Sequence, residues 1–298
     1  MSANGTTVGR QVEMACLFGL LSALTFALGL TLQQRGTLQT TAREGDSRFF
    51  REILSKPVWL LGSFLLFCGW IAQATALRYG SLALVQSLLA LSIVFALPFG
   101  KLLTSQQIGR RAFVGALTTL AGVVLLVTLG QTQGGIDHPG VARWWISGFS
   151  ILALIPVLIL LARFRRGAVR AAMFGVIAGL AFAFQAAATK MLVQELGHGL
   201  LGVFVSWPLY VALAAEVGGF ALQQSALKTG FLAPAAAALN AATLAASVVL
   251  GVAVFEESFI SGSGHIWLAV VGLIIAIAGV VMLAAQTRPD SEMLPVTQ

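Results

Sequence analysis

The chain has 298 residues, of which 58% are hydrophobic and only 10% are charged, and its mean hydropathy is +0.90. A soluble domain must cover its surface with polar groups, so this composition excludes an ordinary soluble protein and indicates a polytopic membrane protein. The net charge of +7 would favour a nucleic-acid partner in a soluble chain, but membrane proteins carry an excess of lysine and arginine on their cytoplasmic side. We therefore expect a lipid bilayer and no nucleic acid.

Nine segments of the chain are long and apolar enough to cross a bilayer as helices, which takes about 20 residues. Their continuous apolar runs favour helices over the strands of a transmembrane barrel, which would alternate in polarity. The predicted fold is therefore an all-α polytopic membrane protein with nine transmembrane helices. We predict spans at residues 15–34, 58–78, 82–100, 109–129, 143–162, 171–192, 203–226, 231–255 and 265–286.

Basic residues are distributed very unevenly between the two sets of connections that these spans define. Most of them, including the run from Arg163 to Arg170, fall on one side, whereas Arg10, Arg78, Arg143 and Lys190 fall on the other. The positive-inside rule then predicts an N-terminus outside and a C-terminus in the cytoplasm of a cell (plasma or inner) membrane.

An internal repeat relates the two halves of the chain. Residues 69–89 align with residues 219–239, residues 18–27 with 174–183, and residues 115–126 with 272–283. Leucine and alanine match often by chance in a chain of this composition, whereas glycine, glutamine and basic residues do not. The matches of the second kind are Gly69 with Gly219, Gln73 with Gln223, Gly80 with Gly230, and Arg78 with Lys228.

Spans 1–4 thus correspond to spans 6–9, and span 5 stands between them. A four-helix unit followed by one odd crossing enters the membrane the second time from the opposite side, so the repeat is inverted, as in many secondary transporters. We predict a first four-helix repeat at 1–134, a connecting helix within 135–170, and a second four-helix repeat with a short tail at 171–298. Small-xxx-small faces at Gly19 and Gly175 would let helices approach closely within each half.

The junction of the second and third spans reads KPVWLLGSFLLFCGWIAQATALRYGSLALVQSLLALSIVFAL, and its second copy reads FALQQSALKTGFLAPAAAALNAATLAASVVLGVAVFEE. Both resemble the drug/metabolite transporter superfamily (EamA-like). In the nine-span plan and the short A-L-x-x-G junction the chain is most similar to the NIPA-like magnesium transporters. That family has an acid and an asparagine in its second span, where this chain reads Cys68 to Gln73 without an acid. The resemblance implies a multi-pass transporter and, as one alternative, magnesium transport.

Glu216 is the acid that falls inside a predicted span, and a charge at the middle of a membrane helix is a functional-site hypothesis by default. It shares a helix face with Gln223, so we interpret Glu216 as a proton- or cation-responsive group and Gln223 as a polar contact to substrate. The alternative is a structural Glu216, protonated or paired with a donor such as Lys190. The further candidates for substrate or ion binding are Gln224, Asn240, Thr243, Gln185 and Gln73.

No catalytic signature is found, because Walker A, H-E-x-x-H and G-x-S-x-G patterns do not occur. We expect neither an enzyme nor a cofactor. Histidines and acids on the predicted outer side could form an ion-collecting vestibule, but loops that are translocated tolerate such residues, so no metal site is assigned. These residues are His138, His198, His265, Asp137, Glu195, Glu256 and Glu257.

The pattern favours a secondary-active transporter of a small polar solute or metabolite working by alternating access, with export as the direction that the resemblance implies. A homodimer is compatible with this plan. Two alternatives remain at this point: a magnesium or other divalent-cation transporter, and a non-transporting membrane scaffold or regulatory partner.

Overall fold

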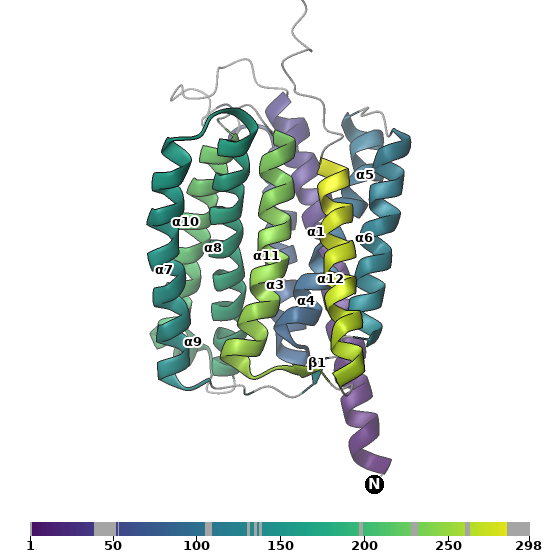
Figure 1. The fold of residues 1–298 in the computed structure, drawn as a ribbon, viewed down its shortest axis with the longest axis vertical. Helices are drawn as coiled ribbons and strands as arrows, with labels where there is room; N and C mark the ends of the chain where they lie inside the picture. The colour runs from purple at the N-terminus through teal and green to yellow at the C-terminus, as the bar shows by residue number, and fades with distance from the viewer. Residues whose placement is uncertain are drawn as a thin grey trace, which may run out of the picture. The chain divides into compact units, whose positions relative to one another are not determined.

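A computed structural model describes residues 2–38, 52, 54–104, 109–129, 132–133, 136, 139–196, 199–227, 232–259 and 263–284. These residues form helices and one antiparallel pair of short strands (Figure 1). The helices are α1 (Ser2–Leu38), α3 (Pro57–Tyr79), α4 (Leu82–Leu89), α5 (Ser92–Thr104), α6 (Arg110–Leu129), α7 (Val141–Arg163), α8 (Gly167–Glu195), α9 (Leu200–Val205), α10 (Trp207–Leu227), α11 (Leu232–Phe255) and α12 (Ser263–Ala284), and the strands are β1 (Thr132–Gln133) and β2 (Ser258–Phe259).

Six helical stretches in the described part of the chain are long and apolar enough to cross a membrane, and one of them comprises both α4 and α5. The helical, multi-pass membrane class expected from composition is confirmed at this level. The six stretches are Gly9–Gln33, Pro57–Tyr79, Leu82–Leu103, Ala142–Arg163, Val169–Glu195 and Ala238–Phe255.

Two predicted spans are divided rather than continuous helices. Residues 82–100 separate into α4 and α5, where Leu91 N–H donates to the carbonyl of Leu88 at 3.0 Å in a tight turn. Residues 203–226 separate into α9 and α10 at Ser206, two residues before Pro208. Proline has no N–H to give to the carbonyl four residues earlier, and it is well tolerated in the first turn of a helix, which is its place in α10. The carbonyl that Pro208 leaves free, that of Phe204, accepts the Tyr210 hydroxyl at 2.8 Å.

Contacts divide the chain into two compact units, which are described separately. The first contains α1, α3, α5 and the end of α4, and the second contains residues Ser81–Ser87 at the start of α4 together with α6 to α12. In the first unit α1 packs on α3 through glycines, since a Cβ at Gly62 would lie 2.7 Å from the carbonyl oxygen of Gly29. Such close backbone approach is what small residues permit between membrane helices.

In the second unit α8 is the central helix, and α7, α10 and α11 pack against it (Figure 1). A Cβ at Gly175 would be 3.2 Å from Cβ of Ala238, and one at Gly179 would be 2.9 Å from the backbone nitrogen of Thr243. Residue numbers rise together along the two helices, so α8 and α11 run parallel. Gly175 therefore does allow a close helix contact, as its small-xxx-small pattern predicts.

Helices α6 and α12 form a second close pair in this unit. A Cβ at Gly122 would lie 2.7 Å from the carbonyl oxygen of Gly272, and a Cβ at Gly279 would lie 2.8 Å from that of Gly115. The early part of each helix faces the late part of the other, so α6 and α12 are antiparallel.

Candidate functional site

Lys190 and Glu257 form an ion pair inside the second unit. Lys190 lies near the end of α8, Glu257 lies two residues after α11, and Lys190 Nζ is 2.5 Å from Glu257 Oε1. The Lys190 side chain is 7% exposed and that of Glu257 is 0% exposed. Charges are almost never fully buried unless they are paired. Each of these two buried charges therefore requires the other as its partner.

The Glu257 carboxylate also caps the first turn of α4. Leu82 N–H donates to Oε1 at 2.5 Å, and Ala83 N–H donates to Oε2 at 3.3 Å. The hydroxyl of Ser81 accepts the next free donor, Leu84 N–H, at 3.1 Å. The first N–H groups of a helix lack internal partners and carry partial positive charge, so a carboxylate is well placed there. Glu257 thus occupies a ready-made anion-binding position.

The backbone after α11 is shaped to bring Glu257 to this place. Glu256 has φ of 53°, in the left-handed region, and Glu257 N–H donates back to the carbonyl of Gly251 at 3.0 Å. A left-handed conformation costs a non-glycine residue roughly 1–2 kcal/mol. A Cβ at Gly251 would collide with the Glu257 carboxylate. The left-handed backbone at Glu256 and the missing side chain at Gly251 therefore both allow the Glu257 side chain to reach α4.

Residues at the start of α7 and at the end of α11 make further contacts around the ion pair. Lys190 Nζ lies 4.7 Å from the centroid of the fully buried Phe255 ring, a cation–π contact. The carbonyl of Phe255 accepts Ile136 N–H at 2.7 Å, and β1 pairs with β2 beside it. Arg143 and Glu256 form an ion pair that is about half exposed, with side-chain exposures of 49% and 47%. The two acids are adjacent in sequence, but Glu256 is in a half-exposed pair and Glu257 is in a buried one.

Two further polar atoms near this site are buried without a partner. Among the described residues, Gln86 Nε2 and Ser247 Oγ are the buried side-chain atoms for which no hydrogen bond is found. Each unsatisfied buried donor costs about 1–3 kcal/mol. Gln86 lies four residues after Leu82 on α4, and Ser247 lies four residues before Gly251 on α11, so each is one helical turn from a residue that contacts Glu257.

Glu216, the main candidate from sequence, lies at the exposed surface of α10. The large apolar side chains around it in sequence, those of Leu213, Val217 and Phe220, are exposed as well. The proposed alternative of a Glu216–Lys190 pair is wrong, because Lys190 is bound to Glu257. Gln223 is half-buried on the same helix, and the side chain of Gln224 lies outside the described structure.

The remaining sequence candidates are spread over three helices. Gln185 is buried on α8, and its Nε2 donates to Thr189 Oγ1 at 3.0 Å. Thr243 on α11 donates to the carbonyl of Leu239 at 2.8 Å and lies 3.3 Å from that of Gly179. Asn240 is half-buried on α11, and Gln73 is buried on α3 in the first unit.

Sequence reasoning considered Glu257 only as one of several acids on the outer side and did not pair it with Lys190. The available signal was a lone lysine inside the apolar run of residues 171–192, which needs a buried counter-charge. The histidines and Asp137 of the expected vestibule do not add to this picture: Asp137, His138 and His198, as well as the His265 side chain, lie outside the described residues. Within those residues no group of three or more His, Cys, Asp or Glu side chains could hold a metal ion.

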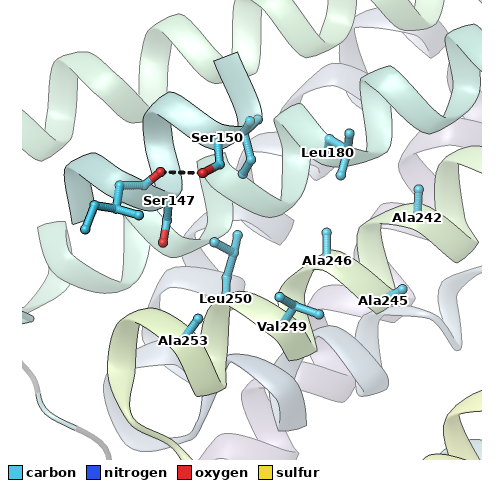
Figure 2. A pocket seen from close by; sticks show the side chains of 11 residues that line it. Ser147, Ser150, Leu180, Ala242, Ala245, Ala246, Val249, Leu250 and Ala253 are labelled. Atoms are coloured by element: carbon cyan, nitrogen blue, oxygen red, sulfur yellow. Dashed lines mark hydrogen bonds between the residues drawn. The ribbon is translucent and has the colours of Figure 1, made fainter. Parts of the chain in front are cut away.

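A separate pocket of about 450 Å³ lies between α7, α8 and α11. Figure 2 shows its lining, which is apolar apart from two serines, and Ser150 donates to the carbonyl of Ile146 at 2.7 Å. None of the sequence candidates lines it. The lining residues are Ile146, Ser147, Ser150, Ile151, Leu180, Ala242, Ala245, Ala246, Val249, Leu250 and Ala253.

The comparisons with known proteins give one relative without an assigned function. The chain is 28% identical over 249 residues to an uncharacterized protein of Corynebacterium glutamicum, an alignment that covers 83% of this chain and 86% of that protein. No family model matches the chain. No solved structure matches it either.

Proposed function

We propose that the protein is a secondary-active transporter that moves a small polar solute across the membrane by alternating access. Its plan would be nine spans built as two inverted four-helix repeats around a central helix, with the N-terminus outside and the C-terminus in the cytoplasm. The observation that carries the proposal is a set of helix contacts that recur at repeat-equivalent residues.

The first recurring contact joins the first and second helices of each repeat. In the first unit a Cβ at Gly69 would lie 2.7 Å from the Phe26 ring, and in the second unit a Cβ at Gly219 would lie 3.0 Å from the Phe182 ring. Gly69 aligns with Gly219, and Phe26 aligns with Phe182. The same pair of residues therefore makes the same helix contact twice.

The second recurring contact joins the first and third helices of each repeat. A Cβ at Gly19 would lie 2.8 Å from Leu88 Cδ1, and a Cβ at Gly175 would lie 3.2 Å from Ala238 Cβ. Gly19 aligns with Gly175, and Leu88 with Ala238. Two independent contacts with matched partners support duplication of a whole helix arrangement and not of a single motif.

The fourth helices of the two repeats, α6 and α12, support the inverted relationship. Gly115 aligns with Gly272 and Gly122 with Gly279, and the contact of Gly122 with Gly272 is matched by that of Gly279 with Gly115. Two antiparallel helices that exchange equivalent residues in this way are related by a local two-fold axis. Inverted repeats related by an axis in the membrane plane are typical of secondary transporters.

The discontinuous third span supports transport as well. In such transporters the half-helix ends of broken spans bind the anionic groups of substrates and coupling ions. Here the third span is broken after the eight residues of α4, and the first N–H groups of α4 are bound by Glu257, which pairs with Lys190. A buried charge pair beside a broken span supports a site for a polar solute.

The test is flux into proteoliposomes that contain the purified full-length protein. Protein-dependent, saturable uptake or release is measured for labelled organic anions, amines, sugars and amino acids and for Mg²⁺, against liposomes without protein. Saturable flux of an organic solute is the expected result. Flux restricted to Mg²⁺ would assign the magnesium alternative, and the absence of flux for every solute would contradict transport and favour the scaffold alternative.

A further inference from the structure

The Glu257 carboxylate accepts hydrogen bonds from three donors on two helices. Lys190 approaches it from α8, and the N–H groups of Leu82 and Ala83 approach it from α4. The residues of α4 itself carry no charge, and the adjacent Glu256 is neutralised by Arg143 of α7. Without Glu257, the buried ammonium group of Lys190 and the first N–H groups of α4 would lack their anionic partner. The protein's own carboxylate therefore stands where an external anion would bind.

Donors continue one turn further along both helices. Gln86 on α4 and Ser247 on α11 are buried, and among the described residues their Nε2 and Oγ atoms have no partner. The register in which Gly179 of α8 lies beside Leu239 and Thr243 of α11 also brings Gln185 to about the level of Ser247, because parallel helices rise equally per residue. A structural ion pair by itself does not require unsatisfied donors at its side.

We propose that this is the solute site, and that the solute is a small organic anion whose carboxylate replaces Glu257. The inference rests on the proposed function and names its substrate class. The solute carboxylate accepts hydrogen bonds from Lys190 and from Leu82 and Ala83 N–H, and its remaining polar atoms accept from Gln86 and Ser247.

The exchange requires one proton for each anion. A proton from the aqueous phase adds to a Glu257 carboxylate oxygen, and the neutral acid leaves Lys190 and the start of α4. The solute carboxylate then pairs with Lys190, which keeps its charge. On release the anion departs, Glu257 gives up its proton to the other aqueous phase, and the Lys190–Glu257 pair forms again. No covalent bond other than the O–H bond is made or broken, and the site keeps the same net charge before and after.

The experiment measures binding of radiolabelled lactate to the purified full-length protein by equilibrium dialysis. Saturable binding that tightens as the pH falls is expected, with competition by acetate and benzoate and none by methylammonium or glucose. Ser247→Ala and Gln86→Leu should each weaken lactate binding about tenfold, the upper end of the effect of removing one hydrogen bond.

Ser87→Ala is the matched control. Ser87 is also fully buried, but its hydroxyl already donates to the carbonyl of Ala83 on its own helix at 2.7 Å. The control protein should bind lactate like the unmodified protein. An equal loss in Ser87→Ala and Ser247→Ala would show that the effect comes from packing, and it would overturn the assignment.

The Glu257→Gln variant tests whether the solute carboxylate takes the place of the Glu257 carboxylate. Glutamine cannot ionise and does not compete as an anion, so this variant should bind lactate at least as tightly as the unmodified protein and without dependence on pH. Where this variant does not fold, Ser247→Ala and Gln86→Leu decide the question. Absence of saturable lactate binding in the unmodified protein overturns the inference.

Flux measurements distinguish failure of the anion site from failure of the proposed transport function. Saturable transport of amines or sugars together with no lactate binding would overturn the anion site and leave the transporter standing. No flux of any solute would contradict the transporter, whatever the binding result. Lactate uptake driven by an inward proton gradient, and lost in Gln86→Leu, is the result that supports both.

Discussion

Lys190 Nζ lies 2.5 Å from Glu257 Oε1 across 67 residues of sequence, with both side chains almost completely removed from solvent. Two charges in a low-dielectric interior attract strongly, but each has lost its hydration, and the balance holds only while both are present.

Removing one partner of the buried pair should strongly destabilise the protein. Lys190→Met leaves a buried carboxylate without its counter-ion, and we expect the free energy of unfolding to fall by about 3–5 kcal/mol. Denaturation in mixed detergent micelles, followed by circular dichroism, measures this. Arg143→Met at the half-exposed pair with Glu256 is the control and should change it by about 0–1 kcal/mol. Equal effects of the two substitutions would show that the buried pair has no special energetic role.

Gly251→Ala should displace the Glu257 carboxylate, because the added methyl group would occupy its place. Overpacking of this kind typically costs about 1–3 kcal/mol. Gly218→Ala in α10 is the matched control, since a Cβ there meets nothing within 4 Å, and alanine favours a helix by roughly 0.8–1.0 kcal/mol over glycine. The melting temperature should fall in the first variant and stay equal or rise in the second. A fall in both would point to a general intolerance of substitutions.

Glu256→Gly should stabilise the protein. Glycine adopts the left-handed conformation without the cost of roughly 1–2 kcal/mol that a side chain brings, and the lost ion pair with Arg143 is half exposed and weak. Glu256→Ala loses the same ion pair without relieving the backbone, so it should be less stable than Glu256→Gly. The two variants are compared by thermal unfolding, and equal stability would show that the φ angle at this residue carries no strain.

Two acids are candidates for the proton-responsive group of the proposed transport. Glu216 is the candidate from sequence, and Glu257 is the candidate from the structure. Because Glu257 lies in the proposed solute site and Glu216 is exposed on α10, we expect Glu257→Gln to abolish the pH dependence of flux in proteoliposomes and Glu216→Gln to retain it. Loss of the pH dependence in Glu216→Gln, together with its retention in Glu257→Gln, would assign the proton-responsive role to Glu216.

The local elements follow closely from the sequence, because hydrophobic length is a property that each segment carries by itself. The predicted stretch at 143–162 is α7, and that at 171–192 lies within α8. The division of 82–100 into α4 and α5 was not predicted, since the apolar run continues through Ala90 and Leu91 and no proline or glycine marks the turn. Pro98, which could have marked a kink, lies inside α5.

The site could be predicted only in part. Gln185, Thr243 and Asn240 were identified as polar residues in apolar segments, but their partners depend on which helices touch. Glu216 stood out because a carboxylate inside a span is costly, yet the direction that it faces is set by helix packing, and the structure exposes it. Glu257 lies just after the predicted span 231–255, where an acid is common because it can be exposed to water.

The sequence by itself determined the membrane class and the positions of most long helices, because apolar length can be read along one chain. Only the tertiary structure decided that Lys190 meets Glu257 at the start of α4. That contact joins three segments that are distant in sequence, and it exists because glycine-mediated packing of α8 on α11 and the reversed backbone at Glu256 bring two charges together away from water.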